Sequence, residues 1–230
     1  DPATQSGQFD LSMEGVDLRA FAGGASNLDL SARLSGIVSA SFDDGKLSQA
    51  TGQGLISDTL FGASAMPNGS WWLRHGPGGL DGSLEIPGDQ RLAIRLDDLD
   101  LNAKQGSLTL DVGNFDLATL ATVFEPWAPE AQRPLMRTVK EFGGRISVQA
   151  NANGALDTPA VALDSLSVQN MTYRDQAIGA LVAQGARSGE GVWTLDQFRW
   201  DRGLDDLGQP LPGLVLLSGI AEERGPIVID

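Results

Sequence analysis

The sequence from Gly143 to Gly154 reads Gly-Gly-Arg-Ile-Ser-Val-Gln-Ala-Asn-Ala-Asn-Gly, and this stretch decides the fold class. Every second residue from Ile146 to Ala152 is apolar, and the residues between them are polar. Successive side chains of a β-strand point to opposite faces of the sheet. The alternation therefore predicts a strand with one apolar face and one polar face.

Similar alternating runs occur along most of the chain, for example in residues 28–42, 92–96, 108–112 and 161–173. The phase of the alternation changes by one residue between some of these runs. Such a change predicts a β-bulge or a turn, because a shift of one residue would otherwise exchange the two faces. Together with 29 glycines among 230 residues, the pattern predicts an all-β chain with many turns.

Two segments interrupt the strand pattern. Residues 62–90 contain many glycines and prolines and are predicted to form a loop-rich excursion. Residues 201–213 are predicted to form another loop. Residues 214–217 and 227–229 are predicted to be the closing strands.

A helical pattern occurs once with clear spacing. Apolar residues recur from Leu117 to Phe124 at the i, i+3, i+4, i+7 positions of one helix face. Asp116 is the predicted N-cap, because a short carboxylate can accept a hydrogen bond from the first turn.

A second short helix is predicted for residues 130–140, where it would bury Leu135, Met136 and Val139. The expected organisation is a β segment at 1–114, a short helical joint or plug at 115–142 and a second β segment at 143–230.

The chain is strongly acidic, with 30 Asp and Glu against 16 Lys and Arg and a formal charge of −14. Nucleic acids and anionic membrane surfaces attract basic proteins, so the composition argues against both as partners. The absence of cysteine excludes disulfides and thiolate chemistry. No apolar run is long enough to span a bilayer. The chain begins with Asp1 rather than Met, so we expect it to be part of a longer or processed protein.

No catalytic or metal-binding signature competes with the strand pattern. His75 is the single histidine, and typical zinc sites need more histidines or cysteines. Residues 98–102 resemble the start of a calcium loop, but Ala103 and Thr109 stand where glycine and glutamate are required. We therefore expect no catalytic residue, no metal and no cofactor.

Two weaker signals point to carbohydrate or membrane contact. Adjacent aromatic residues at Trp71 and Trp72 could form a sugar-stacking or membrane-edge platform, although packing is the simpler interpretation. Paired carboxylates could serve a glycosidase. With 30 acidic residues, however, close pairs are expected by chance.

The segment 115–159 resembles the recurrent unit of the TamB family, the inner-membrane component of the translocation and assembly module, within the wider group of AsmA-like proteins. Members read as an apolar helix, a Leu/Pro link, a Gly-Gly strand with alternating apolar residues and a Gly-x-Leu-x-x-Pro motif. Those places are filled here by Leu117, Leu120, Gly143, Gly144, Gly154, Leu156 and Pro159. The resemblance covers residues 90–200 and is looser elsewhere.

The resemblance implies an all-β fold with one or two short helices, in which an elongated antiparallel sheet folds lengthwise (a β-taco) around an apolar groove. Such bridge-like lipid transfer proteins are anchored in the inner membrane and cross the periplasm. They are associated with phospholipid transport towards the outer membrane, outer membrane biogenesis and protein secretion. This chain would be a periplasmic segment, with the membrane anchor and the part that binds an outer-membrane barrel protein outside it.

One apolar side of the strands is predicted to line a groove for phospholipid acyl chains, which implies a conduit rather than an enzyme. The candidate groove residues are Leu30, Leu34, Leu92, Ile94, Leu96, Leu108, Leu110, Ile146, Val148, Leu166 and Val168. Two alternatives stay open: a structural β-solenoid or sandwich of a surface adhesin, and a secreted glycan-active enzyme. The lipid class, the direction and energy source of transport, the oligomeric state and the barrel partner do not follow from the sequence.

Overall fold

The computed structural model of the chain describes residues 6–17, 30–100, 102–127, 130, 133–187, 192–203, 214–222 and 227–229. Its strands are β1 (Gly7–Asp17), β2 (Leu30–Asp43), β3 (Lys46–Phe61), β4 (Ser64–Ala65), β5 (Gly69–Gly76), β6 (Gly79–Ile86), β7 (Arg91–Asp100), β8 (Gln105–Asp116), β9 (Phe142–Ala155), β10 (Ala160–Tyr173), β11 (Gln176–Arg187), β12 (Val192–Asp201), β13 (Leu214–Glu222) and β14 (Ile227–Ile229). Its helices are α1 (Leu117–Phe124), the 3-10 helix η2 (Glu125–Trp127) and α2 (Arg133–Val139).

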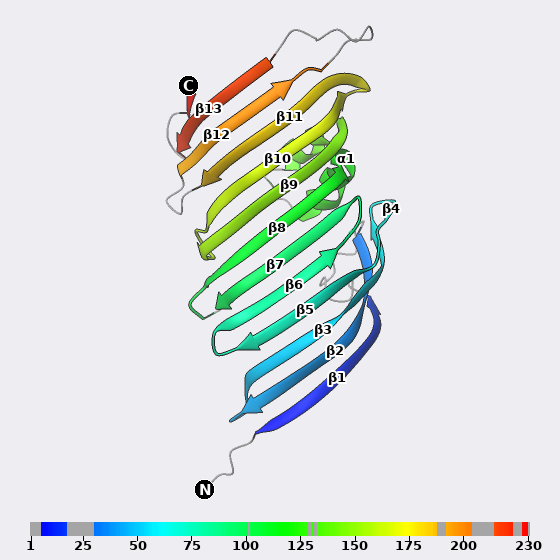
Figure 1. Cartoon of the computed structure of the whole chain (residues 1–230), viewed down its shortest axis with the longest axis vertical. Helices are drawn as coiled ribbons and strands as arrows, with labels where there is room; N and C mark the ends of the chain where they lie inside the picture. Colours follow the sequence, from blue (N-terminus) through cyan, green and yellow to red (C-terminus); the bar gives the residue numbers. More distant parts are fainter. Residues whose placement is uncertain are drawn as a thin grey trace.

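The strands form a single antiparallel sheet of 14 strands, which is elongated and does not close into a barrel (Figure 1). They follow one another in chain order from β1 to β14, and the two-residue β4 pairs with β3 off this path. The predicted all-β class, with an elongated antiparallel sheet and short helices, is confirmed. Because β8 pairs directly with β9, the sheet continues across the helical segment that separates these strands in sequence.

The changes of phase in the apolar pattern coincide with β-bulges. In β8, the pairing with β9 shifts between Val112 and Phe115, and Asn114 between them has a φ of 59°. In β7, Asp98 has a φ of 53° where the pairing with β8 also shifts. Asn and Asp tolerate this left-handed region better than most residues. Each bulge returns the next apolar residue to the same face of the sheet, as the pattern predicts.

The segment 62–90 contains the full-length strands β5 and β6, so the prediction of a loop-rich excursion was wrong. The two strands meet at a turn and pair without interruption as far as Gly76 and Gly79. Gly69, at the start of β5, and Gly82, within β6, belong to strands. A Cβ placed on Gly69, for example, would lie 2.3 Å from the carbonyl oxygen of Glu85. Such glycines permit a close approach between strands, whereas a glycine-rich sequence more often marks a loop.

The first helix forms where the sequence predicts it. Asp116 caps α1, because its side chain accepts a hydrogen bond from the backbone N–H of Thr119 at 2.8 Å. Val123 of α1 is 2% exposed and belongs to the buried core. The helix is therefore fixed to the end of β8 both by its cap and by apolar packing.

The second helix differs from its prediction. It is shorter than expected and fully buries none of its residues. The prediction that Leu135 would be buried was wrong, since it is 62% exposed, and Met136 and Val139 are only half-buried. The helical spacing does form a helix, and ion pairs as well as its half-buried Met136 and Val139 connect α2 to its surroundings.

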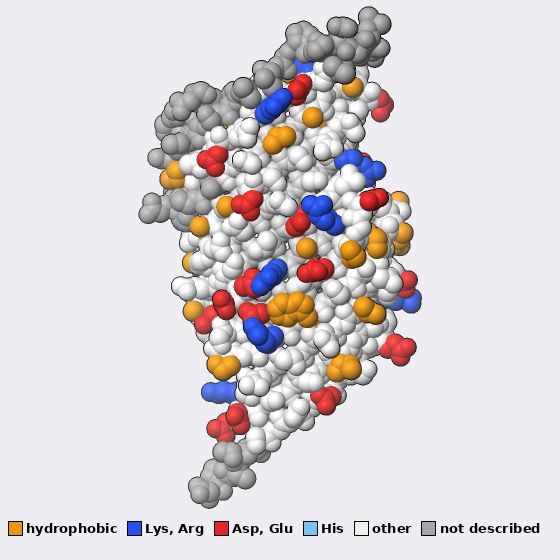
Figure 2. Space-filling view, in the orientation of Figure 1, with side chains coloured by type: hydrophobic (Ala, Val, Ile, Leu, Met, Phe, Trp, Pro, Cys, Tyr) orange, Lys and Arg blue, Asp and Glu red, His pale blue; other side chains and the backbone are white. Residues whose placement is uncertain are grey.

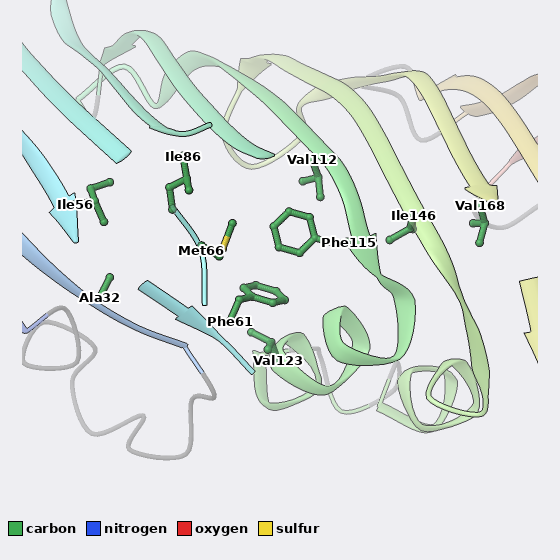
Figure 3. Packing of buried hydrophobic residues seen from close by; sticks show 10 residues of the cluster. All are labelled: Ala32, Ile56, Phe61, Met66, Ile86, Val112, Phe115, Val123, Ile146 and Val168. Carbon is green, nitrogen blue, oxygen red and sulfur yellow. The ribbon is translucent and has the colours of Figure 1, made fainter. Parts of the chain in front are cut away.

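The buried core lies where strand ends meet α1 (Figure 3). Phe61 of β3 and Phe115 of β8 pack edge to face, with ring centroids 4.9 Å apart and ring planes at 73°. Ile56, Phe115 and Val123 are among the most deeply buried large side chains. The best-packed part of the molecule is therefore at one margin of the sheet.

A group of glycines accommodates Trp71. A Cβ on Gly36 would come within 2.8 Å of the Trp71 ring, and one on Gly52 within 3.0 Å. The indole Nε1 of Trp71 donates a hydrogen bond to the carbonyl oxygen of Ser35 at 3.3 Å. On the neighbouring strand, a Cβ on Gly54 would lie only 1.9 Å from that same carbonyl oxygen. The Trp71 ring thus lies over Gly36 and Gly52, which have no side chains.

We expect Gly54→Ala to lower the free energy of unfolding by about 2 kcal/mol or more, because the added methyl group overlaps backbone that cannot move independently of the sheet. Gly76→Ala is the matched control, since a Cβ on Gly76 meets nothing within 4 Å. Urea unfolding followed by circular dichroism measures both. Equal losses of stability in the two variants would contradict the close approach described for Gly54.

Candidate functional site

Strand pairing brings the predicted groove residues to one face of the sheet. Partners in register share a face, and Val148 pairs with Val112 on one side and with Leu166 on the other. We call this surface the apolar face. Its members among the predicted residues are Leu34, Leu92, Ile94, Leu96, Leu108, Leu110, Ile146, Val148, Leu166 and Val168. Leu30 begins β2 opposite Phe61, but its side chain is outside the described part of the structure.

The apolar face also includes residues that were not predicted from the sequence. Trp71 pairs with Leu84, and Leu84 pairs with Ile94, so β5 and β6 connect the two halves of the face. Part of the signal was present in the sequence, because Leu84 and Ile86 are separated by a single polar residue, Glu85. The high glycine content of residues 62–90 led to the prediction of a loop instead.

Burial divides the apolar face into two zones. Close to α1, Ile146 and Val168 are only 7% and 5% exposed. Farther from α1 along the strands, Ala40 and Ala50 are buried, but the larger apolar side chains keep contact with solvent, and Leu108 is 39% exposed. We call this second zone the open strip. It consists of Trp71, Leu73, Leu84, Ile94, Leu96, Leu108, Leu110, Ala150, Ala152, Val161 and Leu163, each half-buried or exposed.

The described elements place no second layer over the open strip. Each described strand contacts mainly its hydrogen-bonded neighbours, and α1 packs against β8 and β9. The described strands form one sheet, with α1 behind the strands in Figure 1. At the end near α1, Phe61 of β3 packs on Phe115 of β8 although β5, β6 and β7 lie between these strands in the sheet. A contiguous apolar surface of this kind marks a site for an apolar ligand or partner. The open strip is therefore the candidate functional site.

The opposite face of the sheet is polar, and we call it the polar face. Acidic and basic side chains are interspersed on it (Figure 2). Arg91 of β7 donates a hydrogen bond to Asp111 of the neighbouring strand β8 at 3.2 Å. Arg95 pairs with Asp97 within β7 at 2.9 Å. Exposed pairs of this kind contribute little to stability. They do keep one side of the sheet hydrated.

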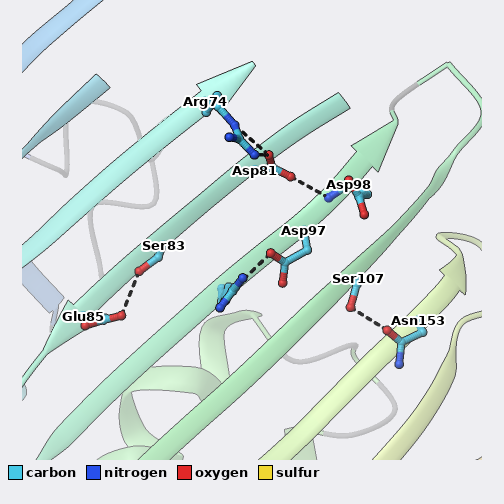
Figure 4. Close-up of polar contacts among 9 residues, drawn as sticks. Arg74, Asp81, Ser83, Glu85, Asp97, Asp98, Ser107 and Asn153 are labelled. Carbon is cyan, nitrogen blue, oxygen red and sulfur yellow. Dashed lines mark hydrogen bonds and ion pairs between the residues drawn. The ribbon is translucent and has the colours of Figure 1, made fainter. Parts of the chain in front are cut away.

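One carboxylate of the polar face is held more firmly than the others. Asp81 accepts a hydrogen bond from the backbone N–H of Asp98 at 2.9 Å and is paired with Arg74 at 2.5 Å (Figure 4). The hydrogen bond from Asp98, followed by that from Arg74, lowers the pKa of Asp81. His75 follows Arg74 directly in β5, so strand alternation places its side chain on the opposite, apolar face. The geometry is that of a structural carboxylate which joins β5, β6 and β7.

The two adjacent tryptophans point to opposite faces. Trp71 lies in the open strip, whereas Trp72 is 39% exposed on the polar face. They do not form one aromatic platform, because strand alternation separates them. Ile37 and Leu55 are also on the polar face and are 58% and 62% exposed. These exposed apolar residues were not predicted from the sequence.

Ion pairs hold α2 to the end of α1. Glu125 of η2 accepts a hydrogen bond from Arg137 at 2.8 Å and also binds Lys140. The hydrogen bond from Lys140, and then that from Arg137, lowers the pKa of Glu125. Arg174, in the turn between β10 and β11, pairs with Glu141 at 3.0 Å. The contacts of Glu125 add to the partial burial of Met136 and Val139 in α2.

No other site stands out among the described residues. They contain no group of three or more side chains able to hold a metal ion. None of the described helices has the length and apolar character needed to cross a membrane. In comparisons with known proteins, no family model, no curated protein and no solved structure matches this chain.

We expect the attachment of α2 to weaken at low pH. The pKa of Glu125 is lowered from its ordinary value of 4.5 in the folded chain. The stabilisation is therefore present above that ordinary value and is lost as the pH falls through the lower, folded-state pKa. Hydrogen exchange of the α2 amides, corrected for the intrinsic effect of pH, should report weaker protection in acid. Glu125→Gln should have weak protection at every pH, while Glu130→Gln, at an exposed position, should behave like the unaltered chain. Strong protection of α2 in Glu125→Gln at neutral pH would contradict this role.

Proposed function

We propose that the chain is a periplasmic segment of a TamB-like, AsmA-like cell-envelope protein, and that its apolar face forms a groove for phospholipid acyl chains. Phospholipid would move along this groove towards the outer membrane. Parts of the longer protein outside this chain would anchor it in the inner membrane and contact an outer-membrane barrel protein, supporting the assembly of outer-membrane proteins. The observation that carries the proposal is the apolar face that runs across the strands, together with the open strip, whose side chains are half-buried or, at Leu108, exposed.

The register of the sheet supports a conduit rather than a single binding pocket. Apolar rows run across the strands, as in the row that joins Trp71, Leu84 and Ile94. Neighbouring strands lie about 4.8 Å apart, so equivalent apolar contacts recur at short steps along the long axis of the sheet. An acyl chain could move from one strand to the next without leaving an apolar surface.

Apolar burial alone can hold such a ligand. Each methylene group that leaves water for an apolar surface contributes about 0.8 kcal/mol. The strip needs no charged or hydrogen-bonding residue to retain acyl chains, and none of its members carries a charge. This matches a role in which different phospholipids share one path.

The observed geometry favours this proposal over the two alternatives. An adhesin sandwich would need a second sheet over the apolar face, and the described strands form one sheet. A glycan-active enzyme would need carboxylates directed at a substrate. Asp81, Asp97 and Asp111, by contrast, are paired with arginines on the polar face.

A charge on the apolar face should remove lipid. We expect Val148→Asp to lower the phospholipid retained per chain by about tenfold or more, because an acyl chain cannot pack against a carboxylate that must stay hydrated. Leu108→Asp, at a more exposed position, should have the same effect with less risk to folding. Gln149→Asp and Thr109→Asp place the same charge on the polar face and are the matched controls. Lipid mass spectrometry of the purified chains, with circular dichroism as a check of folding, measures the outcome. An unchanged amount of phospholipid per chain in Val148→Asp and Leu108→Asp would contradict the proposal.

The adjacent tryptophans provide a second test with an internal control. Two variants would each retain a single tryptophan, Trp71 or Trp72, with the other four replaced by phenylalanine. Phospholipid with brominated acyl chains should quench the fluorescence of Trp71, because this side chain lies in the open strip. Trp72 should keep its fluorescence, because it faces the other way. Equal quenching of the two variants, or stronger quenching of Trp72, would place the lipid elsewhere.

A further inference from the structure

The polar face carries an exposed aromatic ring inside the sheet. Trp72 of β5 is 39% exposed, and strand alternation directs it away from the open strip. It lies on the face seen in Figure 2. The chain around it, residues 30–100, is described without a gap. A tryptophan that keeps contact with water offers a flat apolar surface to a ligand.

A line of uncharged polar side chains runs beside this ring. Gln49, Thr51 and Gln53 alternate along β3 and share the polar face. Gln53 pairs with Trp72, and Thr51 pairs with Arg74. The three β3 side chains are exposed, and among the described residues they have no side-chain hydrogen-bond partner. Amide and hydroxyl groups both donate and accept hydrogen bonds, as the hydroxyl groups of a sugar do.

The polar face is hollowed beyond Trp72 along β5. The hollow has a volume of about 380 Å³ and lies between β3 and the turn that joins β5 to β6. Its lining includes Gln49, Thr51, Arg74 and Asp81. Arg74 follows Trp72 by two positions, which is about 7 Å along an extended strand. A ligand longer than one sugar ring therefore reaches both the tryptophan and the hollow.

The charges at this site are compensated within the protein. Nε and Nη2 of Arg74 both donate to Oδ2 of Asp81, at 3.1 and 2.5 Å (Figure 4). A guanidinium has five N–H groups, so Arg74, which is 69% exposed, keeps further donors for a ligand. An anionic ligand would meet Asp81 and Asp98 at the hollow and a formal charge of −14 overall. The site therefore favours an uncharged ligand with many hydroxyl groups.

The surroundings of Trp72 suit a saccharide better than a protein partner. Gln53 and Ser83 adjoin the ring on its two sides, and Gln53 separates it from Ile37. Leu55, diagonally across from Trp72 in the register, is the apolar neighbour on β3. The centre of a protein interface is a larger and continuous apolar area that excludes water. A single ring with hydrogen-bonding groups on both sides instead matches a sugar, which has an apolar C–H face and a polar rim.

We propose that Trp72 and the hollow beside it bind a neutral oligosaccharide of pyranose rings. One ring stacks its C–H face on Trp72, and its hydroxyl groups form hydrogen bonds with Gln53 and Ser83. The next ring lies over the hollow, within reach of Thr51 and the remaining N–H groups of Arg74. This inference does not depend on lipid binding, because the site is on the face opposite the open strip.

Fluorescence titration of a chain that retains Trp72 alone tests the proposal, with the other four tryptophans replaced by phenylalanine and folding checked by circular dichroism. The probes are cellotetraose, tetra-N-acetylchitotetraose and maltotetraose, three neutral saccharides of the same length. At least one of them should produce a saturable change in the fluorescence of Trp72. The chain that retains Trp71 alone should show no change. Added sodium chloride should leave the affinity unchanged, because the ligand carries no charge.

Variants of the unaltered chain, studied by calorimetric titration, separate stacking from general adhesion. Trp72→Ala should weaken saccharide binding by about tenfold or more, and Trp72→Phe should lose less because it keeps a ring. Gln53→Ala should weaken binding by about threefold. Val182→Ala is the matched control, because Val182 is 37% exposed on the polar face, between Ser167 and Arg199. It should bind saccharide like the unaltered chain.

Two results would overturn the proposal: no saturable binding of any of the three saccharides, or the same affinity in Trp72→Ala as in the unaltered chain. Sedimentation without saccharide tests a protein as the occupant. Self-association that Trp72→Ala abolishes would assign this surface to a second copy and would also refute the proposal. Val148→Asp should bind saccharide normally, since its substitution is on the apolar face, so the lipid and saccharide proposals fail independently.

Discussion

The structure depends on keeping every apolar side chain on the same face of a sheet that bends and bulges. A strand has a period of two, so a shift of one residue exchanges its faces. In β10, the pairing with β11 shifts between Val168 and Met171, and Asn170 between them adopts a φ of 51°. The extra residue of the bulge returns Met171 to the apolar face. Asp58 in β3, with a φ of 50°, is another short polar residue in the left-handed region of a strand.

A single-layer sheet with one apolar face cannot bury that face by itself. Folded domains normally cover such a face with a second sheet or with helices. Here the close packing is concentrated near α1, around Phe61 and Phe115. The polar face, with its interspersed charges, and the acidic composition keep the chain hydrated on the other side. Within the described part of the chain, the apolar face therefore keeps contact with solvent, as the proposed acyl-chain groove requires.

Features that depend on local pattern were predictable from the sequence. Alternation predicted the strands and the shared face of Leu110, Val148 and Leu166, and the spacing of apolar residues with Asp116 predicted α1. Prediction failed where one residue type has two uses. Glycine marks turns, but Gly69 permits close strands instead, so β5 and β6 were missed. Helical spacing likewise predicted α2 but not its surroundings: Leu135 is exposed, and the ion pairs of Glu125 with Arg137 and Lys140 have no short sequence signature.

The position of α1 decides whether the helical segment blocks the open strip or flanks it. The helix begins at Leu117, directly after Phe115 in the buried zone, and packs against β8 and β9. Leu110 of the open strip precedes Phe115 by five positions in β8, a separation of about 16 Å along an extended strand. An α-helix with its side chains is about 10 Å across. A helix centred over the strand ends therefore forms a wall beside the strip and leaves the apolar row through Leu110 and Ala150 continuous past it.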